Sequence, residues 1–171
     1  HAANEKFASY RLRIIDSKTR IDDIRMSARH MQYDLIVVDY MQLIDPGKRY
    51  AGNRASEVGE ISREMKKLAM SLNVPIILLS QLNRDSEKLK IKEPSMAELR
   101  ESGAIEQDAS IIMLMWNASD DGKHKKIKIE KNRQGTRGVI NLFFDGSRVT
   151  FEEEEWEDAE ADKGTGEPSF R

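Results

Sequence analysis

A run of apolar residues near the middle of the chain, Leu35–Val38, ends on the acid Asp39. Such a run, rich in β-branched residues, is typical of a parallel strand buried on both faces. Ligands bind outside the carboxyl ends of strands in open α/β sheets, and a carboxylate there can hold Mg²⁺ beside phosphate oxygens. Asp39 is therefore a candidate metal ligand, with a structural or capping aspartate as the alternative.

A second polar residue, Gln81, follows the next apolar run, Ile76–Ser80. If the two runs are neighbouring strands, Gln81 faces the same crevice as Asp39. An amide suits a phosphate site because it can donate to phosphate and accept from water or protein. The alternative for Gln81 is an ordinary hydrogen bond at the end of a strand.

Two bases, Lys131 and Arg133, lie on one arm of a predicted β-hairpin around Gln134–Gly138. In an alternating strand they project to one face, where both could approach one phosphate group. The guanidinium adds planar, permanently charged donors. The alternative is a pair of solvated bases on an exposed hairpin.

The elements that must position these residues follow from periodicity and turn residues. Apolar spacing predicts helices over 20–32 and from Ser56, as the capping residue, to Leu72. A short helix is predicted near 95–100. The predicted strands are 12–15, 34–39, 76–80, 110–116, 126–133, 139–144 and 148–151. This order predicts an α/β fold whose central sheet is mainly parallel, with an antiparallel edge hairpin.

Composition narrows the class of protein. The 171 residues fit one domain, have no cysteine for disulfides or thiolate metal sites, and contain no apolar run long enough for a membrane span. Residues 1–151 carry 26 Lys and Arg against 21 Asp and Glu, whereas 152–162 carry eight acids and no base. A mildly basic body permits nucleic-acid binding, and the acidic 152–171 segment is predicted to be a disordered tail.

Four segments in order resemble the RecA-like motor domain of DnaB-type replicative DNA helicases. They are Asp34–Ile44, with the Walker B pattern; Ile61–Arg84; Leu99–Ala109; and Lys131–Gly135, with the pattern Lys-x-Arg-x-Gly. The resemblance covers roughly residues 10–151 and implies a partial RecA-like P-loop NTPase core over 1–151. It also implies ATP and Mg²⁺ as ligands, with Asp39 holding the metal.

The same resemblance assigns further roles. Gln81 matches the γ-phosphate sensor, and Arg133, with Lys131 beside it, matches an arginine finger that reaches the nucleotide of the adjacent subunit. Arg100, Glu101 and Gly103 match the family's central-channel DNA loop, and the bases of the 45–56 loop are further channel candidates: Lys48, Arg49 and Arg54. For that loop, a mobile charged surface is an equal alternative. Few aromatics are available for base stacking, so backbone tracking on single-stranded DNA is expected.

Partners and location also follow from the resemblance. It implies a homo-hexameric ring in the cytoplasm, in a bacterial or phage replisome, without membrane contact. Primase and a helicase loader are possible partners of such a ring.

One expected motif is missing from the 171 residues. Neither Gly47-Lys48-Arg49 nor Gly122-Lys123-His124 fits the Walker A loop Gly-x-x-x-x-Gly-Lys-[Ser/Thr]. The resemblance places that N-terminal portion upstream, so we expect this chain alone not to hydrolyse ATP. Two rival functions stay open: another RecA-like ATPase such as a recombinase, and a non-catalytic DNA- or partner-binding module derived from such a domain.

Overall fold

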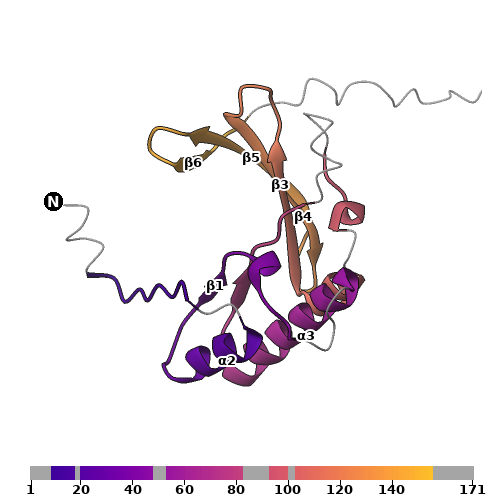
Figure 1. Cartoon of the computed structure of the whole chain (residues 1–171). Helices are drawn as coiled ribbons and strands as arrows, with labels where there is room; N and C mark the ends of the chain where they lie inside the picture. Colours follow the sequence, from indigo (N-terminus) through magenta and orange to yellow (C-terminus); the bar gives the residue numbers. More distant parts are fainter. Residues whose placement is uncertain (1–8, 18–19, 48–52, 83–92, 100–102, 156–171) are drawn as a thin grey trace, which may run out of the picture. The chain divides into compact units, whose positions relative to one another are not determined.

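The computed structural model describes residues 9–17, 20–47, 53–82, 93–99 and 103–155 (Figure 1). Internal contacts divide the chain into two units, one of residues 1–81 and 101–108, the other of residues 82–100 and 109–171. Each unit is described by itself. Within the described residues, no helix is both long and apolar enough to cross a membrane.

The first unit joins a two-stranded parallel sheet to helices on one of its faces. Its elements are α2 (Ile21–Arg29), β1 (Ile36–Val38), the 3₁₀ turn η1 (Met41–Leu43), α3 (Arg54–Leu72), β2 (Ile76–Leu78) and α4 (Gly103–Asp108). β1 pairs with β2 in parallel, Val37 opposite Ile77. The long helix between them supplies the crossover that parallel strands require.

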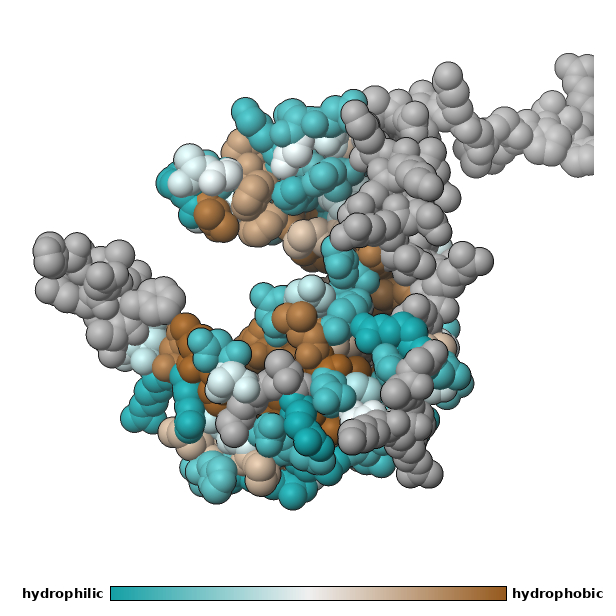
Figure 2. All heavy atoms as spheres, in the orientation of Figure 1, coloured by the Kyte–Doolittle hydropathy of each residue, from teal (hydrophilic) through white to brown (hydrophobic). Residues whose placement is uncertain are grey.

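The core of this unit lies between α2, α3, η1 and the inner face of the sheet. Met41 and Ile61 are its most deeply buried large side chains, at 2% and 0% exposure. The apolar stripe that the sequence predicts for α3 is buried there: Val58, Ile61, Met65 and Leu68. The outer face of the sheet is also apolar but open, with Val37 and Ile77 exposed, and Figure 2 shows apolar side chains at the surface around these strands.

The ends of α3 are fixed by two asparagines. The Asn53 side chain accepts a hydrogen bond from the Ser56 amide and caps the N-terminus, so the expectation that Ser56 is the cap was wrong. Both residue types cap well, and the helix begins three residues earlier than expected. Asn73 ends the helix in the left-handed conformation, directly after Leu72, where the sequence predicts the helix to end.

The second unit is an antiparallel sheet of four strands in chain order. They are β3 (Ile111–Asn117), β4 (His124–Asn132), β5 (Gly138–Asp145) and β6 (Thr150–Glu153), preceded by the 3₁₀ turn η4 (Met96–Leu99). The predicted hairpin is confirmed as β4 and β5. A bulge interrupts the β3–β4 register between Ile112 and Met113.

The expectation of a mainly parallel sheet was wrong for the described residues, where four of the six strands are antiparallel. The connections between β3, β4, β5 and β6 are short turns, and short turns can join only antiparallel neighbours. Residues 12–15 form no strand. β6 includes Glu152 and Glu153, so it extends two residues into the segment predicted as an acidic tail, most of which lies outside the described residues.

Candidate functional site

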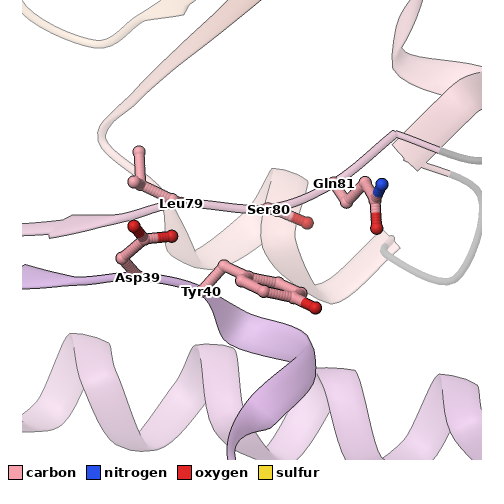
Figure 3. A pocket seen from close by; sticks show the side chains of 5 residues that line it. All are labelled: Asp39, Tyr40, Leu79, Ser80 and Gln81. Carbon is pink, nitrogen blue, oxygen red and sulfur yellow. The ribbon is translucent and has the colours of Figure 1, made fainter. Parts of the chain in front are cut away.

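The candidate site lies where β1 and β2 end side by side. Hydrogen bonds continue past both strands: the Leu79 amide donates to the Val38 carbonyl at 3.0 Å, and the Met41 amide donates to the Leu79 carbonyl at 2.8 Å. The chain segments after the two strands therefore stay together. They line a pocket formed by Asp39, Tyr40, Leu79, Ser80 and Gln81 (Figure 3).

Asp39 and Gln81 thus line the same pocket, as their positions after two neighbouring strands predict. Both are exposed, whereas Tyr40 and Ser80 are half-buried. In the view of Figure 3 the Tyr40 ring lies between the Asp39 carboxylate and the Gln81 amide. The peptide bond between Asp39 and Tyr40 is cis. The pocket therefore offers a solvent-accessible carboxylate and a separate amide that can donate and accept.

The acid content of the pocket suits Mg²⁺ that arrives with a nucleotide. The described residues contain no cluster of three or more His, Asp or Glu side chains that could cage a metal. Mg²⁺ usually keeps several waters and binds one or two carboxylates together with substrate phosphates. A single exposed carboxylate at Asp39 fits that mode of binding and does not fit a structural metal site.

Sequence reasoning missed a further polar side chain next to the pocket, Gln42. Its Nε2 donates to Ser80 Oγ at 3.1 Å and to the Gln81 carbonyl at 3.2 Å, and the Gln81 amide donates to Gln42 Oε1 at 3.4 Å. The only signal in the sequence is its position three residues after Asp39. Nothing in the periodicity of that segment predicts the turn η1 that brings Gln42 to β2.

Lys131 and Arg133 belong to the second unit. Lys131 pairs with Ile112 within β4, but Arg133 follows the last residue of that strand, and its amide donates to the Ser110 carbonyl at 3.0 Å. Arg133 lies one residue beyond the strand, and the shared face that alternation predicts for Lys131 and Arg133 stays a prediction. The shared approach to one phosphate stays a prediction.

The turn after β4 gives a physical reason for the glycine of the Lys-x-Arg-x-Gly pattern. Asn132 bridges the turn: its Nδ2 donates to the Thr136 carbonyl at 3.1 Å, and its Oδ1 accepts from the Gln134 amide at 3.2 Å. A Cβ at Gly135 would lie 2.7 Å from Asn132 Nδ2. Glycine leaves room for the bridge that shapes the turn next to Arg133.

The DNA-loop candidates lie in several places. Lys48, Arg49, Arg100 and Glu101 fall outside the described residues. Gly103 is the first residue of α4, and Arg54 is the first residue of α3, where its Nη1 donates to Glu57 at 3.2 Å. Their contact with DNA stays a prediction.

Comparisons with a family model, with related sequences and with solved structures all lead to the same family. Residues 1–153 match the model of the DnaB-like helicase C terminal domain. The chain is 42% identical over 135 residues to the replicative DNA helicase DnaB of Geobacillus stearothermophilus, covering 73% of this chain, and 40% identical over 135 residues to the replicative DNA helicase DnaC of Bacillus subtilis, again covering 73%. It spans about 30% of the length of both relatives.

A solved structure shares the fold. It is a DnaB-like replicative helicase, described together with its interactions with primase, and it matches with a TM-score of 0.75 at 30% identity. The match covers 88% of this chain and 39% of that one. The mixed α/β chain belongs to the DnaB-like helicase C-terminal domain family.

Proposed function

We propose that this chain is part of the motor of a replicative DNA helicase that couples ATP hydrolysis to translocation on single-stranded DNA and to duplex unwinding. The observation that supports this most is the pocket at the ends of β1 and β2, which is lined by both Asp39 and Gln81. Membership of the DnaB-like helicase family supports a nucleotide as the ligand of that carboxylate and amide.

Asp39 and Gln81 have distinct roles in this proposal. Asp39 holds Mg²⁺, directly or through a water, beside the nucleotide phosphates. When bound, the metal neutralises charge on the phosphate oxygens. Gln81 contacts the γ-phosphate and transmits the nucleotide state to the DNA loops. The loss of either side chain therefore impairs ATP turnover for a different reason.

A second set of residues acts between subunits in this proposal. Arg133, with Lys131 beside it, reaches the nucleotide of the adjacent subunit and stabilises charge on the transferring phosphate. Such a head-to-tail interface closes into a ring, for which we propose a homo-hexamer. The candidate channel residues Arg100, Gly103, Arg54, Lys48 and Arg49 follow the DNA backbone. Glu101 orients its loop or accepts from a backbone amide and does not contact phosphate.

The setting of this motor is a bacterial or phage replisome. Primase is a candidate partner, because the similar DnaB-like helicase structure describes interactions with primase. A helicase loader is a second candidate.

The experiment is a forked-duplex unwinding assay on the product of the complete reading frame, with and without ATP and Mg²⁺. We expect unwinding that requires both. Strand exchange without unwinding would identify a recombinase instead. DNA binding without ATP turnover would identify a non-catalytic module, the alternative that the absence of a Walker A pattern from these 171 residues leaves in place.

A further inference from the structure

The main-chain hydrogen bonding between the segments of β1 and β2 ends just before Gln81. After Val38 the segment that follows β1 turns into η1, and the last main-chain bond between the two segments runs from the Met41 amide to the Leu79 carbonyl. The segment that follows β2 continues past that point to Ser80 and Gln81. Another group must therefore fix the backbone of Gln81 if its side chain is to keep a defined place in the pocket.

The Gln42 side chain supplies that group. Its amide both donates to the Gln81 carbonyl, at 3.2 Å, and accepts from the Gln81 amide, at 3.4 Å. A side-chain amide carries the same donor and acceptor as a peptide group, so this two-way contact reproduces one more rung of the sheet. The additional bond from Nε2 to Ser80 Oγ, at 3.1 Å, holds the preceding residue.

Gln42 is itself held firmly. It belongs to η1, and the preceding residue, Met41, is 2% exposed in the core of the first unit. Gln42 also follows Asp39 by only three residues. The contact therefore joins the segment after β1, which carries the candidate metal ligand, to the segment after β2, which carries the candidate phosphate sensor. Gln42 itself does not line the pocket.

We propose that Gln42 is a positioning residue, which fixes Gln81 relative to Asp39 through this paired amide contact. The inference rests on the proposed function, since it gives Gln42 a part in ATP turnover. Displacing a group that must meet the reacting phosphate by about 1 Å can reduce a rate roughly a hundredfold. We expect the effect in kcat, because Gln42 contacts Gln81 and does not line the pocket.

Two substitutions separate positioning from folding. Gln42→Met keeps the length of the side chain and removes both hydrogen-bonding groups. Gln42→Glu keeps the shape and the acceptor, but its carboxylate has no donor for the Gln81 carbonyl. Protonation of that carboxyl restores a donor beside an acceptor, so lowering the pH rescues Glu and cannot rescue Met. Gln32→Glu, at an exposed residue that does not line the pocket, controls for the added charge.

The first test measures DNA-stimulated ATP hydrolysis by the complete protein from pH 5.5 to 7.5, always relative to wild type at the same pH. At pH 7.5 we expect both Gln42 variants to lower kcat roughly ten- to a hundredfold with an unchanged KM for ATP. The relative kcat of Gln42→Glu should rise as the pH falls. Wild-type kcat in Gln42→Met at pH 7.5 would overturn the proposal.

The second test needs no ATP turnover. Amide hydrogen exchange at Gln81 in the 171-residue chain should speed up on the order of tenfold in Gln42→Met, because the Gln81 amide loses its hydrogen-bond acceptor and opens more easily. The Leu79 amide should stay protected. Unchanged exchange at Gln81, or equal loss of protection at Leu79, would overturn the paired contact. A wild-type protein without ATPase activity would refute the proposed function instead, and the exchange result would still decide whether Gln42 holds Gln81.

Discussion

Arg133 is the residue whose proposed role depends most on a second subunit. If it completes the nucleotide site of its neighbour, a mixture of Arg133→Ala and Asp39→Asn subunits contains some sites in which both residues are intact. We expect each variant alone to lose DNA-stimulated ATP turnover, Arg133→Ala by about 10³-fold or more, and mixed rings to regain part of it.

The mixing result is read in steady-state ATPase assays of reassembled rings. Rings made of Arg133→Lys subunits alone are the control. They should stay inactive because an ammonium cannot replace the planar guanidinium. No recovery in any mixture would show that Arg133 does not act across subunits.

Asp145 offers a residue-level test of the second unit. The Ser147 hydroxyl, the Arg148 guanidinium and the Ser147 amide donate to it and lower its pKa to about 2. A carboxyl with a lowered pKa stabilises the fold above its unfolded pKa of about 3.9, and that contribution is lost as the pH falls through about 2. We therefore expect the stability difference between wild type and Asp145→Asn to shrink between pH 4 and pH 2.

Two measurements check this expectation: NMR titration of the Asp145 carboxyl and urea unfolding of both proteins across that pH range. Ser17→Ala, far from this turn in the sequence, is a control that should leave the titration unchanged. A midpoint near 3.9 would contradict the hydrogen-bonded turn between β5 and β6.

At the scale of elements, α3 and α4 approach each other closely at Gly59. A Cβ there would lie 3.3 Å from the Ala104 Cβ, so a larger side chain must push α4 away. α4 follows the candidate DNA loop directly. We expect Gly59→Leu to cost about 1–3 kcal/mol of unfolding free energy through overpacking, and to weaken single-stranded DNA binding by the complete protein.

Chemical denaturation and fluorescence anisotropy with labelled single-stranded DNA measure the two effects. Gly103→Ala is the matched control for stability, because a Cβ at Gly103 meets nothing within 4 Å. Wild-type stability in Gly59→Leu would show that α4 can move without cost.

The elements differ in how far the sequence predicts them. The stripe of α3 and the β4–β5 hairpin follow from local patterns, and both predictions were confirmed. The share of parallel pairing was not predictable from apolar content, because β3 is as apolar as β1 but pairs with the strand that follows it through a short turn. Strand-end residues Asp39 and Gln81 could be grouped by topology alone. Gln42 could not, because a 3₁₀ turn after β1 decides where its amide lies.

At the scale of the whole molecule, the chain carries the residues that we propose for one part of a nucleotide site and lacks a Walker A pattern within its 171 residues. Backbone amides and a lysine of such a loop cradle phosphates. We therefore expect the 171-residue chain alone to show no Mg²⁺-dependent ATP turnover, as measured by phosphate release with and without single-stranded DNA. Turnover that survives further purification and vanishes in Asp39→Asn would contradict this expectation.

The most direct measurement is Mg²⁺-dependent ATP hydrolysis by the complete protein carrying Asp39→Asn, with Asp34→Asn as its matched control. Asp34 lies before β1 and does not line the pocket, so its variant should keep wild-type turnover. Asp39→Asn should lose roughly a hundredfold or more in kcat, since it removes the carboxylate that we propose as the metal ligand. Wild-type turnover in Asp39→Asn would contradict the assignment of this pocket as the nucleotide site.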